Sequence, residues 1–365
     1  MNSIPTQTEE ATVSIRSSFV ALTAAFFIFG GPLTAQEELQ TFEGMVEVSE
    51  VMLDVLVTDP EGNSVLGLEK GDFLVEEEGE EVEITSVNYY ATRYGEGDTS
   101  ADEPPASRFF ILFFHDQTRF RYYGNRLILQ QIKAGQHCRR WLRTHREPSD
   151  WVAVVRHDGE LTIYQDFTQD TEALDEAVKR AAAGKKPVAG RAGGRDRLLS
   201  LRRYLPAMER GEKREDIHHS LGRLATSTSH IVGRKNVMFF TTGFGKENHL
   251  ARATEPDPEL YPPLEALLND HNVAMYPIDL TPPGRPARHA DFLERLADDT
   301  GGVYHEEFVG FINPMKAVGS ENGGYYLLSF VSARPAGEIG YQRLEVRARN
   351  PEIQVRARRG YRYGL

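Results

Sequence analysis

Only one cysteine, Cys138, occurs among the 365 residues. A single thiol cannot close a disulfide within the chain, and it cannot build a zinc site that depends on several cysteines. Basic residues are also outnumbered: 42 Lys and Arg stand against 54 Asp and Glu, giving a net charge of -12. Because nucleic-acid binding needs a basic surface to neutralise phosphates, this balance argues against nucleic acid as the main partner. The apolar share of 40% excludes a fully disordered chain.

Long apolar runs are scarce as well. The apolar segment within residues 18–31 (SFVALTAAFFIFGG) is about 13 residues long, shorter than the roughly 20 residues that a helix needs to span a bilayer. Its length and the small residue Ala35 favour a secretory signal peptide over residues 1–35. We therefore expect a secreted or periplasmic protein with no transmembrane span after cleavage. An uncleaved membrane anchor is the alternative.

Turn and strand patterns divide the rest of the chain. Residues 36–94 alternate apolar and polar side chains between turn residues, which predicts strands without helices. Residues 95–107 have the composition of a linker. Residues 323–365 return to a strand pattern. Each of the two strand-only segments is too small to bury a core alone, so we expect them to pair into one β-sandwich.

Residues 108–322 alternate strands with helices, and this segment would be inserted between the two halves of the sandwich. The run at 109–114 (FFILFF) is apolar throughout, as expected for a strand buried on both faces. The alternation predicts an α/β fold with a doubly wound, mostly parallel sheet. Further strands are expected at 151–157, 160–167, 235–241, 273–279 and 302–305, helices at 127–145, 171–183, 217–231 and 292–299, and a surface excursion at 184–214.

Several segments follow one another in a specific order: VLVTDPEGNSVLGLEKGDFLVEEEG, GRKNVMFFTTGFG, VAMYPIDL, LADDTGGVYHE and VRARRGYRYG. This set resembles the von Willebrand factor type A family, and more closely its secreted bacterial branch, called VWFA-related. The resemblance covers most of residues 46–364. It implies a binding site at the top of the sheet, where the family's adhesion proteins hold Mg²⁺ and leave one position open for an acidic residue of a protein or cell-surface partner.

The family's metal ligands are an Asp-x-Ser-x-Ser motif, a distant Thr and a distant Asp. By position, the resemblance implies that Asp116, Thr118 and Thr168 supply oxygen ligands. At the position of the second Ser this chain has Phe120, which has no ligand atom, and at the position of the distant Asp it has Thr242, which has no carboxylate. A divalent ion that faces one carboxylate loses much of the attraction that two would give. The resemblance therefore implies a degenerate site, in which Mg²⁺ is a candidate cofactor. The partner-binding residues that it implies are Asp116, Thr118, Phe120, Thr168, Thr242 and Gly243.

Three functional classes stay open. The leading hypothesis is a non-enzymatic interaction or adhesion module. An envelope hydrolase would use Asp116 and His115 in the same crevice, but the sequence identifies no second catalytic group. A structural envelope protein would have no open site, with Asp116 capping the following helix and Thr118 and Thr168 bonding locally.

Some conspicuous residues receive a structural interpretation. Cys138 lies in an apolar helix pattern, which predicts a small buried residue. The adjacent His218 and His219 cannot face one ligand from one helix, so a helix surface is expected. The basic residues near the C-terminus predict one solvated strand face: Arg356, Arg358, Arg359 and Arg362.

Overall fold

The computed structural model describes residues 46–91, 107–117, 125–188, 197–208, 215–248, 253–306, 310–335 and 338–364. All of these residues belong to one compact unit. The expected signal peptide at 1–35 and residues 95–106 of the expected linker lie outside the described residues, as do Thr118 and Phe120.

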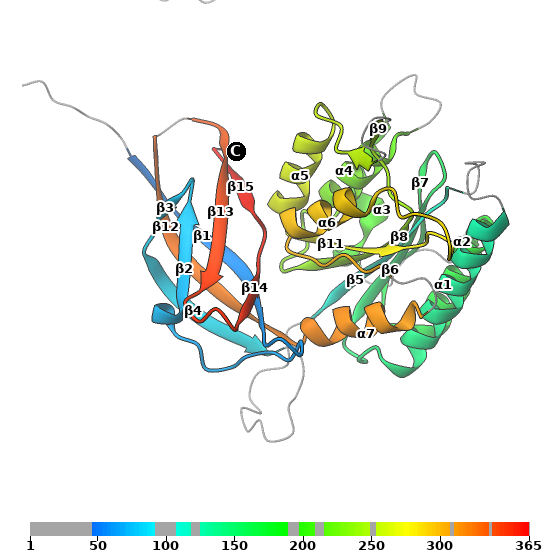
Figure 1. Ribbon diagram of the computed structural model, residues 1–365, viewed down its shortest axis with the longest axis horizontal. Coiled ribbons are helices and arrows are strands. Elements are labelled where there is room, and N and C mark those ends of the chain that lie inside the picture. Colours follow the sequence, from blue (N-terminus) through cyan, green and yellow to red (C-terminus); the bar gives the residue numbers. More distant parts are fainter. Residues whose placement is uncertain are drawn as a thin grey trace, which may run out of the picture. The chain divides into compact units, whose positions relative to one another are not determined.

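A five-stranded sheet forms the centre of the α/β part (Figure 1). Its order is β11-β8-β5-β6-β7, and only the edge strand β7 runs antiparallel to its neighbour. The prediction of a mostly parallel sheet is confirmed. The strands are β5 (Phe109–His115), β6 (Trp151–His157), β7 (Leu161–Thr168), β8 (Lys235–Thr241) and β11 (Val273–Asp279).

Helices cover both faces of this sheet because β5 is apolar on both of its faces. Phe110, Leu112 and Phe114 pack into one hydrophobic cluster, and the alternate residues of the strand pack into another. The first cluster receives α1 (Asn125–Thr144), α2 (Thr171–Ala182) and α7 (Ile312–Glu321). The second receives α3 (Leu201–Tyr204), α4 (Ile217–Ser227), α5 (Tyr261–Asp270) and α6 (Ala290–Asp299).

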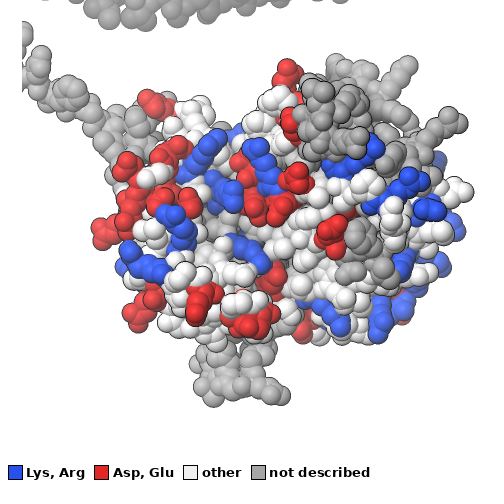
Figure 2. Space-filling model, in the orientation of Figure 1, with Lys and Arg blue, Asp and Glu red and all other residues white. Residues whose placement is uncertain are grey.

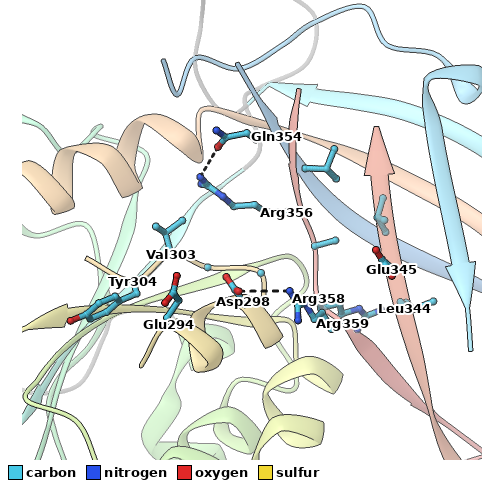
Figure 3. A pocket seen from close by; sticks show the side chains of 15 residues that line it. Glu294, Asp298, Val303, Tyr304, Leu344, Glu345, Gln354, Arg356, Arg358 and Arg359 are labelled. Atoms are coloured by element: carbon cyan, nitrogen blue, oxygen red, sulfur yellow. Dashed lines mark hydrogen bonds and ion pairs between the residues drawn. The ribbon is translucent and has the colours of Figure 1, made fainter. Parts of the chain in front are cut away.

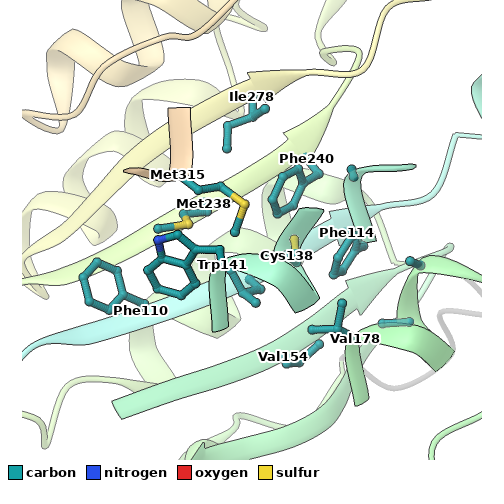
Figure 4. Close-up of a cluster of buried hydrophobic side chains, with 14 of the residues drawn as sticks. Phe110, Phe114, Cys138, Trp141, Val154, Val178, Met238, Phe240, Ile278 and Met315 are labelled. Atoms are coloured by element: carbon teal, nitrogen blue, oxygen red, sulfur yellow. The ribbon is translucent and has the colours of Figure 1, made fainter. Parts of the chain in front are cut away.

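Cys138 lies inside the first cluster, close to Trp141 and Phe114 (Figure 4). Its side chain is fully buried, and burial raises the pKa of the thiol well above its usual value. The prediction of a small buried residue is confirmed. The thiol is packed as an apolar group and is not placed to act as a nucleophile. The expected surface position of His218 was wrong, since the residue is only 7% exposed.

Three described helices, α3, α5 and α7, were not expected from the sequence, and one expected strand is absent. α5 begins with Tyr261-Pro262-Pro263, and α7 carries Pro314 in its first turn. Proline is compatible with a first helical turn because the N–H it lacks would have no partner there, but in a sequence it also indicates a break. The expected strand at 302–305 is reduced to one bridge between Ile278 and His305.

Strands from the two ends of the chain pair with one another. β1 (Val46–Thr58) pairs with β12 (Gly324–Pro335) from Val46 opposite Pro335 to Val55 opposite Tyr326. The two four-stranded sheets, β14-β1-β12-β4 and β15-β13-β2-β3, share one hydrophobic cluster. The remaining strands are β2 (Phe73–Glu77), β3 (Glu80–Glu81), β4 (Ile84–Ala91), β13 (Gly340–Ala348), β14 (Gln354–Arg356) and β15 (Gly360–Tyr363), and a separate hairpin joins β9 (Lys246–Asn248) and β10 (Ala253–Glu255).

The C-terminal arginines do not form a solvated strand face, so that prediction was wrong. Arg356 donates to Glu321 of α7 at 2.7 Å, and Arg358 donates to the carbonyls of Asn269 and Met52 at 2.9 Å each. Figure 3 shows Arg356, Arg358 and Arg359 around a cavity of about 670 Å³, which Glu294 and Asp298 also line. The guanidinium groups therefore tie the C-terminal strands to the helices of the α/β part.

Candidate functional site

The carboxyl ends of four strands meet at one edge of the central sheet, which we call the sheet top. The register places His115 beside His157, and Thr241 beside Asp279. β5 also pairs with β8 up to Phe114, so His115 and Thr241 are neighbours as well. In open α/β sheets this edge is where ligands bind.

Asp116 follows β5 directly and lies at this edge. Its backbone N–H donates to the carbonyl of His157 at 2.8 Å, and its side chain forms an ion pair with the Nη2 of Arg156. The second terminal nitrogen of Arg156 donates to the carbonyl of Ala181 at 2.5 Å, and Asp158 lies 3.7 Å from Nε. Because the Arg156 side chain is only 3% exposed, a permanently charged guanidinium is fixed against the carboxylate.

Arg156 was missed at the sequence level, although a signal was present. It is a charged residue in an otherwise apolar strand (WVAVVRH), one step before the carboxyl end. A buried charge needs a partner, so an acidic neighbour could have been expected. The first described helix after Asp116 begins at Asn125, and the residues between 117 and 125 lie outside the described ones, so the alternative role of Asp116 as a helix cap stays a prediction.

Gln117 organises the neighbouring strand end. Its Oε1 accepts hydrogen bonds from the backbone N–H of Thr242 at 2.7 Å and from its hydroxyl at 2.8 Å. The hydroxyl of Thr241 donates to the same oxygen at 3.2 Å, and Nε2 donates to the carbonyl of Gly243 at 2.5 Å. One amide side chain thus holds the end of β8 against the end of β5. No motif in the sequence pointed to Gln117.

Thr242 and Gly243 reach the sheet top, but the structure does not present them to a partner. Thr242 is 3% exposed, and its hydroxyl is engaged by Gln117. Gly243 has φ +100°, and a Cβ there would come within 2.0 Å of the His289 side chain. Both residues are therefore buried at the sheet top, and direct contact with a partner stays a prediction.

Thr168 is not at this site. β7 runs antiparallel to β6, and Thr168 lies opposite Val152 at the other end of the sheet. The offset from His157 is five residues, or about 16 Å along a strand. The Oγ1 of Thr168 accepts from the backbone N–H of Asp170 at 3.2 Å, and Asp170 caps α2. Assigning Thr168 as a ligand was wrong; its bonding is local.

His115 and Asp116 face different partners. The Nδ1 of His115 lies 2.9 Å from the hydroxyl oxygen of Thr241, and the ring stacks on Phe239. Burial, reinforced by the neighbouring His157, lowers the pKa of His115 well below its usual value, so the ring is neutral. The crevice proposed for a hydrolase thus contains a core histidine and a carboxylate that is paired with Arg156.

The exposed rim of the sheet top comes from the loops after β8 and β11. Gly245 and residues 283–286 are exposed, and they include Arg285; Arg288 is exposed as well. Just below this rim, burial raises the pKa of Asp279, whose Oδ2 accepts from the Tyr304 hydroxyl at 3.2 Å. Figure 2 shows acidic and basic side chains interspersed over the visible face of the molecule.

Within the part of the chain that the structure describes, no group of three or more His, Cys, Asp or Glu residues is placed to hold a metal ion. Of the three predicted Mg²⁺ ligands, Asp116 is paired with Arg156, Thr168 lies at the opposite edge and Thr118 lies outside the described residues. The described residues therefore do not fit a resident Mg²⁺. None of the described helices is both long and apolar enough to cross a membrane.

No family model matches the chain, and no curated protein matches it. Solved structures do. A von Willebrand factor type A protein from Catenulispora acidiphila is 8% identical and covers 87% of this chain and 72% of its own, with a TM-score of 0.35. BatB from Bacteroides thetaiotaomicron is 12% identical and covers 59% of this chain and 97% of its own, also with a TM-score of 0.35.

A third similar structure is proximal thread matrix protein 1 from the mussel byssus, solved with zinc in its MIDAS motif. It is 13% identical and has a TM-score of 0.34; it covers 60% of this chain, whereas this chain spans about half (48%) of it. These likenesses, at TM-scores of 0.34 and 0.35, carry no argument about this chain, and the resemblance to the von Willebrand factor type A family rests on the sequence motifs. At these identities the likeness concerns the fold and assigns no role to a residue.

Proposed function

We propose that this protein is a secreted or periplasmic, non-enzymatic interaction module that captures a protein or cell-surface partner without a bound metal ion. The observation that carries this proposal is the ion pair between Arg156 and Asp116. A divalent ion at Asp116 would have to approach a buried guanidinium, and repulsion between the two cations opposes its binding. In the degenerate site, the guanidinium of Arg156 would then take the place of the metal ion as the positive charge beside Asp116.

The partner would meet the rim of the sheet top, where the exposed Arg285 and Arg288 follow β11. Guanidinium groups bind carboxylates through paired hydrogen bonds, so an acidic residue of the partner suits this rim. The strands from both chain ends, which we take as one β-sandwich, would carry the domain and hold it through Arg356 and Arg358.

Titration calorimetry with Mg²⁺, Mn²⁺ and Ca²⁺ tests the metal-free part of the proposal. We expect no binding at sub-millimolar concentrations, either to the unaltered protein or to the Asp116→Ala variant. Sub-millimolar binding that disappears in the variant would overturn the proposal and make the protein a metal-dependent adhesion module.

Capture of envelope components on the immobilised protein tests the rim. We expect capture to persist in EDTA and to fall when Arg285 and Arg288 are both changed to Glu. Arg349→Glu is the matched control, because Arg349 is exposed in the β part and makes only a 3.3 Å surface pair with Glu81. Equal loss in the control, or capture that requires a divalent ion, would contradict the proposal.

The two competing functions make different predictions. A hydrolase would turn over an ester, phosphate or peptide substrate, and Asp116→Asn would abolish the turnover. A purely structural protein would show no capture that depends on the rim. Turnover by the purified protein that Asp116→Asn removes would replace the interaction module with the hydrolase.

A further inference from the structure

Three aliphatic side chains project into solvent from the first half of α1. Leu129 is 66% exposed, Ile128 40% and Ile132 38%. On an α-helix these three positions fall within an arc of about 100°. The opposite side of α1 is buried in the core through residues such as Ala134 and Cys138. Single exposed apolar residues are ordinary, but a group of three on one side of a helix, which we call the aliphatic patch, indicates a contact surface.

The charges around the aliphatic patch are of one sign. Every charged residue of α1 is basic: Arg126, Lys133, Arg139, Arg140 and Arg143. Arg139 and Arg143 pair with Asp175 of α2. The other three form no ion pair among the residues that the structure describes. Arg126 lies three residues before Leu129 and Lys133 four residues after it, so both side chains flank the patch on the helix surface.

The end of α2 brings further cations to this region. A Cβ on Gly135 of α1 would lie 2.4 Å from the Cβ of Ala182, the last residue of α2, so the end of α2 packs beside the first half of α1. Lys185 and Lys186 follow shortly after Ala182 and are exposed. Figure 1 shows α1 and α2 side by side, and the same edge of the molecule is mostly blue in Figure 2.

An aliphatic patch between unpaired cations is complementary to a surface that is apolar and negatively charged. A folded partner would have to offer a hollow that matches the projecting side chains, whereas the fluid headgroup region of a membrane adapts to them. Lys and Arg beside such a patch are attracted to anionic headgroups. We propose that this face of α1 docks on an anionic lipid membrane. Because the whole chain carries a net charge of -12, its other faces are repelled, and docking depends on this face.

Flotation with vesicles of phosphatidylcholine, with and without phosphatidylglycerol, tests this inference. Residues 36–365 are used, so that the apolar run at 18–31 cannot itself enter the vesicles. We expect at least about tenfold more binding to the vesicles that contain phosphatidylglycerol, and a decrease in binding as salt is added. The assay contains no partner protein, so its result does not depend on the rim proposed above.

Two results would overturn the proposal. One is equal binding to both kinds of vesicle, and the other is no binding to phosphatidylglycerol at low ionic strength. If the patch instead captures an acidic protein while vesicles fail to bind, the surface belongs to a protein partner and the proposal is wrong.

Variants separate the aliphatic patch from the rest of the surface. Leu129→Ser should weaken vesicle binding about tenfold, because one side chain no longer enters the headgroup region. Leu66→Ser is the matched control: Leu66 is 64% exposed but lies outside α1, so a change of about twofold or less is expected. Unchanged binding in Leu129→Ser, or an equal loss in Leu66→Ser, would contradict the assignment.

The basic residues are tested in the same way. Arg126→Glu should weaken binding about tenfold and leave the fold intact, because an acidic residue is favourable in the first turn of a helix. Arg349→Glu, in the β part, makes the same change of charge and should weaken binding about threefold or less. If the two variants lose binding equally, only the overall charge matters, and the docking face is wrongly placed.

Discussion

Arg156 donates a hydrogen bond to Asp116, the residue that the sequence resemblance assigns as the first metal ligand. The two residues meet because β5 and β6 are parallel neighbours. Phe114 of β5 lies opposite Arg156, and Asp116 comes two residues after Phe114, just past the end of β5. The buried guanidinium also holds Ala181 at the end of α2. One side chain therefore joins two strand ends and a helix end, and it neutralises the carboxylate at the sheet top.

Removing Arg156 should destabilise the fold. Arg156→Met removes the buried guanidinium beside Asp116, whose side chain is only 10% exposed, and we expect a loss of about 3 kcal/mol in the free energy of unfolding. Adding Asp116→Asn to this variant should restore part of the loss, because the buried negative charge that Arg156 balanced is then gone. Urea unfolding of both variants measures the difference, and a single variant as stable as the unaltered protein would refute the structural role of the pair.

Gln117 is expected to stabilise the end of β8, as Arg156 stabilises the ends of β5 and α2. Gln117→Leu removes the acceptor for the N–H of Thr242 and the donor for the Gly243 carbonyl, so it should cost about 2 kcal/mol. Gln169→Leu is the matched control: its amide makes one exposed bond to the Ser149 carbonyl, and a change of about 0.5 kcal/mol or less is expected. Thermal unfolding checks both, and equal effects would argue against a special position for Gln117.

The sheet was predictable because uninterrupted apolar runs such as residues 109–114 have few alternatives to burial on both faces. The site was less predictable. Thr168 was misplaced because periodicity does not show strand direction, and the β6–β7 hairpin sends the end of β7 to the far edge of the sheet. Arg156 was missed because its partner is 40 residues away in the sequence, so that only the register of β5 and β6 brings the two together.

Close packing against a neighbouring backbone explains why a glycine stands at position 302. A Cβ on Gly302 would lie 1.8 Å from the backbone carbonyl oxygen of Met275, and backbone atoms cannot yield as a side-chain tip can. Gly302→Ala should therefore cost about 3 kcal/mol through overpacking. Gly62→Ala is the control, because Gly62 has φ +85° but open space around its Cβ position, so only about 1 kcal/mol of backbone strain is expected. Thermal unfolding that ranks the two variants in the opposite order would contradict this explanation.

Lys235 should make stability depend on pH. Burial lowers its pKa to about 7, so between pH 7 and its unfolded value near 10.5 the unfolded chain binds a proton that the folded chain does not. This group therefore adds stability as the pH rises through that window, and its penalty is complete below about pH 7. Lys235→Met removes the penalty and should raise the free energy of unfolding by roughly 5 kcal/mol at pH 6, less the lost bond to the Ile231 carbonyl. Urea unfolding at pH 6 and pH 10 should show that the stability gained by Lys235→Met is smaller at the higher pH. If the gain is the same at both pH values, burial of the charged Lys235 does not destabilise the folded protein.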